Sequence, residues 1–200
     1  MTYVCFSPIP NGASDEPLYP MERQREIEKI KNPTVRREKY FAWKLLEKAV
    51  RLGMRLDFKS LKFNRLEDGR WLSPDFYFSI SHSGGALAVA ISSEPLGIDI
   101  EPLGRGFSEG LVRRYFTEGE KEHYCASSEE HKEECALRIW TAKEAYFKSL
   151  SRDKFEPSRV DTSGISYASG DIDISGSKFI YSLYSEKLDF EILPVDLSEN

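Results

Sequence analysis

Apolar and polar residues alternate in several short runs along this 200-residue chain. The clearest runs lie between residues 78 and 101, where alternation predicts strands at Phe78–Ser81 and Leu96–Glu101 and a short continuous apolar run predicts a strand at Ala86–Ile91. Gly84-Gly85 predicts a turn between the first two. Similar patterns predict further strands at Thr2–Phe6, Arg55–Phe63, Gly164–Tyr167, Ile172–Ser175, Phe179–Ser185 and Leu188–Leu193.

Other segments repeat their apolar residues at helical spacing. They predict helices at about 21–30, 34–52 and 130–150, with Gly53 ending the second as a C-terminal cap. Ser108 is a predicted N-cap, and Thr117-x-x-Glu120 has the capping-box pattern of a further short helix.

Strands and a long helix therefore occur twice along the chain. This order predicts an α+β fold made of two similar halves related by a pseudo-twofold axis, each a small antiparallel sheet packed with a long helix. We expect an N-terminal half at 1–95 and a C-terminal half at 96–200.

Charge is unevenly distributed. The net charge of -5 argues against nucleic acid as a partner. Residues 21–59 nevertheless carry twelve Lys/Arg and six Asp/Glu, which indicates a local anionic ligand rather than a polyanion.

Three cysteines without metal-site spacing indicate reduced thiols. The N-terminal residues lack the basic flank and long apolar core of a signal peptide, and no apolar run reaches membrane-spanning length. We therefore expect a cytoplasmic protein that does not bind a membrane.

The candidate chemistry begins with two acids on one strand. Asp99 and Glu101 are two residues apart, so strand alternation places both carboxylates on the same face, where they repel each other unless a cation lies between them. Glu144 on the helix at 130–150 could add a third carboxylate. Three carboxylates with phosphate oxygens suit Mg²⁺. An Asp-x-Glu pair alone is more often a solvated strand face, so this site depends on its context.

Basic side chains near these acids could bind phosphates. They are Lys143 and Lys148 on the same predicted helix, His82 between two serines at a strand end, and the basic helices at 21–59. A Glu144–Lys148 surface pair and a structural histidine are the plainer alternatives.

These residues also form recognisable motifs. Ser81-His82-Ser83-Gly84, Gly97-Ile98-Asp99-Ile100-Glu101, Phe116-x-x-x-Glu120 and Trp140-Thr-Ala-Lys143-Glu144-Ala-Tyr-Phe-Lys148 follow one another in this order. The pattern resembles the 4′-phosphopantetheinyl transferase superfamily, in its monomeric surfactin-synthetase-activating (Sfp) type.

The resemblance implies an activity and roles for individual residues. Such enzymes transfer 4′-phosphopantetheine from coenzyme A to a serine of an acyl or peptidyl carrier protein and release adenosine 3′,5′-bisphosphate. By resemblance, Asp99, Glu101 and Glu144 bind Mg²⁺. Predicted coenzyme A contacts are Ser81, His82, Lys143, Lys148, Arg70, Arg23 and Lys39, with Arg36 and Arg37 as substitutes for the last two. Lys148 is also a predicted catalytic residue.

The identity of the base stays open at this point. Glu144, acting through a metal-bound water, and Glu120 are both candidates for removing the serine proton. Ser79 replaces a usual Asn of the family and Arg70-Trp71 replaces a usual Lys-Pro, which affects carrier selectivity and pantetheine binding rather than the reaction class. The alternatives are another Mg²⁺-dependent nucleotide phosphate enzyme, or a non-catalytic homologue that binds coenzyme A or a carrier protein.

Overall fold

The fold is α+β, as predicted, in a computed structural model that describes residues 1–12, 16–150 and 154–197. The five α-helices of this described part are α1 (Met21–Glu28), α2 (Pro33–Ala49), α3 (Glu109–Tyr115), α4 (Glu118–Ala126) and α5 (Lys132–Ser149). None of the helices there is long and apolar enough to cross a membrane.

The strands form two main sheets and a small ribbon. The first sheet has the order β4 (Tyr77–Ser83), β5 (Ala86–Ser92), β1 (Thr2–Pro8), β9 (Phe190–Leu193). The second has the order β6 (Leu96–Pro102), β8 (Ser177–Ser185), β7 (Ala168–Ile174). The ribbon pairs β2 (Asn64–Arg65) with β3 (Trp71–Leu72).

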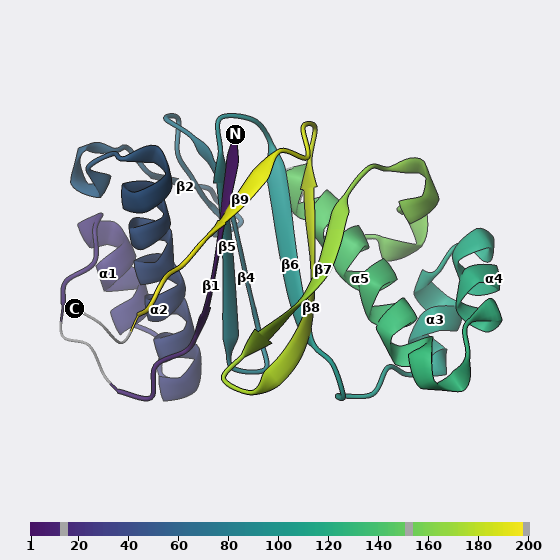
Figure 1. The fold of residues 1–200 in the computed structure, drawn as a ribbon. Helices are drawn as coiled ribbons and strands as arrows, with labels where there is room; N and C mark the ends of the chain where they lie inside the picture. Colours follow the sequence, from purple (N-terminus) through teal and green to yellow (C-terminus); the bar gives the residue numbers. More distant parts are fainter. Residues whose placement is uncertain (13–15, 151–153, 198–200) are drawn as a thin grey trace.

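The elements stack as helix, sheet, sheet, helix. Figure 1 shows α1 and α2 beside the first sheet and α5 beside the second. Strand alternation in β5 explains this stacking, because Leu87, Val89 and Ile91 pack in the core with α2, while Ala86, Ala88 and Ala90 pack in a second core with β6. The small alanines let the two sheets approach closely.

The first sheet differs from the antiparallel prediction in one strand. β9 pairs in parallel with β1, although it comes from the C-terminal end of the chain. Leu197, beyond it, is buried in the core that α2 covers. Residues of the expected C-terminal half, 96–200, therefore also pack with the first sheet.

Local capping decides several helix boundaries. The Asn32 side chain accepts hydrogen bonds from the backbone N–H groups of Thr34 and Val35 and starts α2. The predicted caps Ser108 and Thr117 start α3 and α4, and Glu120 completes the capping box at Thr117. Gly53, however, does not end α2, which continues as a π-helical turn (Val50–Met54) until Arg55 adopts the left-handed region at φ 56°.

Two predicted strands are wrong. Within Arg55–Phe63 the chain forms a 3₁₀ turn at Phe58–Ser60, started by the Asp57 side chain. Gly164–Tyr167 forms no strand either, because its first residue ends another 3₁₀ turn, Thr162–Gly164, which the Asp161 side chain starts. In both places a local side-chain cap on the backbone overrides the apolar alternation.

Candidate functional site

The site lies along a seam between two edge strands, β4 of the first sheet and β6 of the second. Alternate serines of β4 reach across it. Ser79 Oγ accepts from Ile98 N at 3.1 Å, Ser81 Oγ donates to Asp99 Oδ1 at 2.6 Å, and Ser83 Oγ donates to Glu101 Oε2 at 2.5 Å. Side-chain hydrogen bonds thus connect the two sheets and orient both acids of β6.

The three predicted metal ligands share this region, but their oxygens already have cationic neighbours. Lys148 Nζ lies 2.6 Å from Asp99 Oδ1 and 3.7 Å from Glu144 Oε2. Arg105 Nη1 lies 2.7 Å from Glu101 Oε2. Among residues 1–12, 16–150 and 154–197, no three His, Cys, Asp or Glu side chains form a preassembled metal-binding group.

The electrostatics of the acids nevertheless fit a cation. Burial, and next the charge of Asp99, raise the pKa of Glu144 to about 7. Burial is also the main reason that the pKa of Glu101 is raised. Asp99 is 3% exposed, and its buried Oδ2 accepts no hydrogen bond from the part of the chain that the structure describes. Carboxylates that resist ionisation and a buried oxygen without a donor indicate a need for additional positive charge.

A cleft of about 450 Å³ opens beside the acids. The predicted phosphate-binding residues Arg23, Lys39, Arg70, His82 and Lys148 all line it. They come from both halves of the chain. Lys148 belongs to the cleft and also contacts Asp99, so it connects the basic cleft to the acidic seam.

Arg23 is held in the cleft wall by aromatic rings. Its guanidinium lies 4.8 Å from the ring centre of Trp43 and 5.9 Å from that of Trp71. Glu26 Oε2 accepts from Arg23 Nη1 at 2.8 Å and from Trp71 Nε1 at 2.7 Å. Arg23 is 8% exposed, and its buried Nε donates to no group among the described residues. The arginine is therefore rigidly placed with hydrogen-bonding capacity left over.

Two predicted site residues lie elsewhere. Lys143 is completely buried and pairs with Glu120 at 2.7 Å, and its Nζ also donates to the carbonyl oxygens of Pro157 and Val160. Burial lowers the pKa of Lys143. The structure therefore does not bring Lys143 into the cleft, and no exposed part of it can meet coenzyme A.

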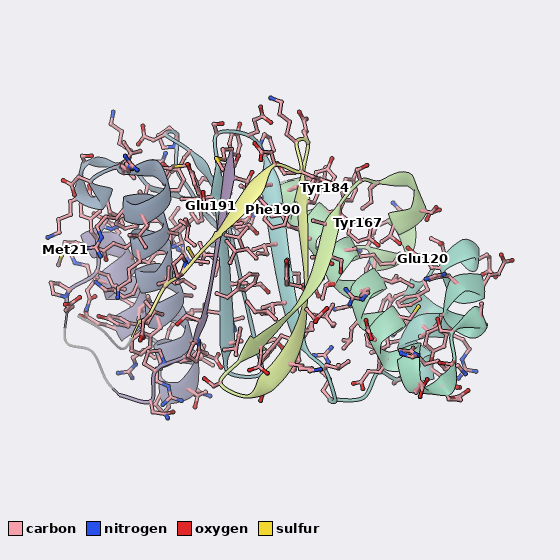
Figure 2. The ribbon with its side chains drawn as sticks, in the orientation of Figure 1. Met21, Glu120, Tyr167, Tyr184, Phe190 and Glu191 are labelled. Atoms are coloured by element: carbon pink, nitrogen blue, oxygen red, sulfur yellow. The ribbon has the colours of Figure 1, made fainter. Side chains whose placement is uncertain are left out.

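Glu120 is equally engaged. Its two carboxylate oxygens accept from Thr117 N at 2.8 Å and from both Thr162 N and Thr162 Oγ1 at 2.9 and 2.8 Å. Figure 2 places it at the end of the molecule formed by α3 and α4, beyond α5. The Glu120–Lys143 pair joins α4, α5 and the segment after Pro157, which is a structural arrangement.

Arg36 and Arg37, considered as substitutes for Arg23 and Lys39, line a different pocket together with Tyr40 and Ile27. The sequence interpretation also missed three contributors to the site: Ser79, Ser83 and Arg105. The alternation Ser79-x-Ser81-x-Ser83 was a usable signal, because residues two apart share a strand face. Arg105 carried no comparable signal beyond its two flanking glycines.

Residues 95–188 match the model of the 4′-phosphopantetheinyl transferase superfamily. The 4′-phosphopantetheinyl transferase Sfp of Bacillus subtilis (strain 168) is 29% identical over 120 residues, 56% of this chain and 53% of the relative. The 4′-phosphopantetheinyl transferase ffp of Bacillus subtilis is 30% identical over 104 residues, 48% of this chain and 46% of the relative. The 4′-phosphopantetheinyl transferase gsp of Aneurinibacillus migulanus is 28% identical over 100 residues, 50% and 42% of the two chains.

The chain therefore spans about half the length of the curated relatives it matches. The similarities confirm the resemblance inferred from the motifs. Both acids of β6 and the helix with Glu144 and Lys148 lie inside the matched segment, whereas the basic residues of the first half precede it.

Proposed function

We propose that this chain, whose residues 95–188 match the model of the 4′-phosphopantetheinyl transferase superfamily, acts as such an enzyme. It would transfer 4′-phosphopantetheine from coenzyme A to a serine of an acyl or peptidyl carrier protein. The other product is adenosine 3′,5′-bisphosphate. The observation that carries the proposal is Lys148, which lines the basic cleft and whose ammonium lies beside both Asp99 of β6 and Glu144 of α5. A phosphate-rich ligand in the cleft would meet the acids at this lysine.

Asp99, Glu101 and Glu144 are the residues proposed to hold Mg²⁺. The ion would neutralise charge on the phosphate oxygens of coenzyme A, which phosphoryl transfer requires. The donor set supports this assignment, because its three members are carboxylates and the pKa values of two of them are raised.

The basic residues are proposed to bind and orient the phosphates. Arg23 and Arg70 line the cleft together with Lys39 of α2 and His82 of β4. Lys148 spreads charge next to Asp99, so binding of a phosphate there would exchange one anionic partner of this lysine for another. Positioning of the pyrophosphate against the incoming serine is the main contribution of these groups.

We propose Glu144 rather than Glu120 as the group that accepts the serine proton. Glu144 lies within 3.7 Å of Lys148, which lines the cleft, so its carboxylate is near the place where the serine would enter. Glu120 is 4% exposed and its carboxylate is held by Thr117, Thr162 and Lys143. We assign the Glu120–Lys143 pair a structural role.

We further propose that the protein acts as a cytoplasmic monomer. One chain supplies both walls of the cleft, from α1 and α2 on one side and α5 on the other. Cys5, Cys125 and Cys135 are free thiols, which suits a reducing compartment.

The test is incubation with coenzyme A, Mg²⁺ and a panel of apo carrier proteins, followed by intact mass measurement. We expect a carrier to gain one phosphopantetheine group, and chelation of Mg²⁺ to abolish the gain. The matched control is Asp99→Asn, which keeps the shape of the side chain and an oxygen facing Lys148 but removes the negative charge. It should fold normally and lose transfer.

Other outcomes identify the alternatives. Coenzyme A binding by calorimetry without transfer to any carrier would favour a non-catalytic binding protein. Release of adenosine 3′,5′-bisphosphate without a carrier would favour a nucleotide phosphate hydrolase. Full activity of Asp99→Asn would contradict the proposed metal site.

A further inference from the structure

A short glycine-flanked loop follows β6 directly. Gly104 and Gly106 adopt left-handed backbone conformations, at φ 93° and 77°, on either side of Arg105. Leu103 N donates to Lys178 O at 2.9 Å and anchors the start of the loop to β8. The chain therefore turns back sharply, and the side chain of Arg105 reaches the end of the strand that it has just left.

A carboxylate from α5 holds this loop. Glu133 Oε1 accepts from Gly104 N at 3.1 Å and from Gly106 N at 2.7 Å. Both amides that flank Arg105 are thus tied to the first turn of the helix that also carries Glu144 and Lys148. These bonds fix the backbone of Arg105 and do not involve its side chain.

The arginine shares one oxygen with a seam serine. Arg105 Nη1 and Ser83 Oγ both donate to Glu101 Oε2, at 2.7 and 2.5 Å. The side chain of Glu101 is 12% exposed and that of Arg105 is 38% exposed. The acid is therefore enclosed, while its cationic partner lies on the solvent side of the pair.

We propose that Arg105 is a displaceable counter-ion that occupies Glu101 until a divalent cation replaces it. This inference rests on the proposed function, because it takes Glu101 as a Mg²⁺ ligand. A guanidinium stays charged at every physiological pH, so it leaves a carboxylate only by moving. The exposed side of Arg105 and its fixed backbone permit that movement without rearrangement of β6.

Two consequences follow from competition for one oxygen. Mg²⁺ binding at Glu101 Oε2 must break the Arg105–Glu101 pair, so the arginine weakens metal affinity in the absence of coenzyme A. The released guanidinium stays near the acids, because Glu133 holds the backbone on both sides of Arg105. The size of the effect is that of a partly exposed ion pair, roughly a two- to fivefold change in affinity.

The test measures Mg²⁺ affinity of the full chain by titration calorimetry, with Mg²⁺ alone and no coenzyme A. Arg105→Gln should bind Mg²⁺ roughly two- to fivefold more tightly than the unaltered protein. Arg105→Lys keeps a cation and should retain the original affinity. Glu133→Gln, which weakens the anchor of the loop, should give an intermediate increase.

Arg113→Gln is the matched control, because it removes the same charge from an exposed position on α3. It should leave Mg²⁺ affinity within experimental error. Equal affinities for Arg105→Gln and Arg113→Gln, or weaker binding by Arg105→Gln, would overturn the inference while leaving the proposed function intact. Absence of Mg²⁺ binding by the unaltered protein would overturn the metal site itself, and with it this role of Arg105.

Discussion

The carboxyl of Glu144 is enclosed by charges of both signs. Asp99 and Glu101 oppose its ionisation and Lys148 favours it, but burial dominates, and the pKa rises from 4.5 to about 7. The single positive charge of Lys148, 3.7 Å away, does not offset burial and the two neighbouring acids. It gives the protein a pH dependence that ordinary surface glutamates would not produce.

We expect this acid to make the cation-free protein less stable as the pH rises. The folded-state pKa is about 7 and the reference value is 4.5, so between these values the folded protein binds more protons than the unfolded chain. The contribution of Glu144 is therefore fully present below pH 4.5 and is lost as the pH passes 7. Urea unfolding with a chelator present, from pH 4.5 to 8, should show a loss of up to about 3 kcal/mol from this group.

Glu144→Gln isolates the effect, since the amide does not titrate. Its free energy of unfolding should exceed that of the unaltered protein increasingly as the pH rises from 5 to 8. Parallel pH profiles for the two proteins would show that Glu144 ionises normally.

At the scale of elements, α5 lies unusually close to β6. A Cβ atom added at Gly97 would stand 1.8 Å from the carbonyl oxygen of Ala145. This atom belongs to the helix backbone and cannot rotate away. Gly97 thus sets the separation between the strand that carries Asp99 and Glu101 and the helix that carries Glu144 and Lys148.

Gly97→Ala should destabilise the protein by about 3 kcal/mol, the upper part of the usual range for overpacking, because strand and helix must move apart. Urea unfolding measures the loss. Gly119→Ala is the control, since a Cβ there meets no atom within 4 Å and the residue lies in α4. It should leave stability unchanged or slightly increased. Similar values for the two variants would mean that the close approach is relieved at little cost.

At the scale of the whole molecule, a strand from the C-terminal part of the chain packs beside the first strand. β9 crosses to the first sheet and pairs with β1, as Figure 1 shows, and the following residues bring Leu197 into the core under α2. Lys48 Nζ on α2 donates to the carbonyl oxygen of Asp196 at 2.5 Å. Residues 190–197 thus form part of the sheet and core that carry the basic wall of the cleft.

Deletion of residues 190–200 should therefore destabilise the N-terminal sheet. The loss of the β1–β9 hydrogen bonds and of Leu197 burial predicts a decrease of at least about 3 kcal/mol in the free energy of unfolding, measured in urea. Leu197→Ala removes only the side chain and should cost about 2 kcal/mol. An unchanged unfolding midpoint after the deletion would show that β9 contributes nothing to the sheet.

Much of the local structure could be predicted from sequence. The caps at Ser108 and Thr117 act between residues at most three apart, so their patterns are complete in the sequence. The alternation that put Asp99 and Glu101 on one strand face agrees with their matching bonds to Ser81 and Ser83. The motifs could be recognised for the same reason, because each spans at most nine consecutive residues.

Tertiary structure decided the features that depend on distant residues. Lys143 and Glu144 are neighbours on α5, but successive residues of a helix point in different directions. Lys143 therefore forms a buried pair with Glu120, whereas Glu144 lies near the acids of β6. The parallel pairing of β9, the serine seam and the Arg105–Glu101 pair arise where separate elements meet. The sequence by itself determined which side chains share a face of a strand or helix. Packing of helix on sheet and of sheet on sheet determined which faces meet. The reason is that burial and hydrogen bonding between distant segments are satisfied only in the assembled fold.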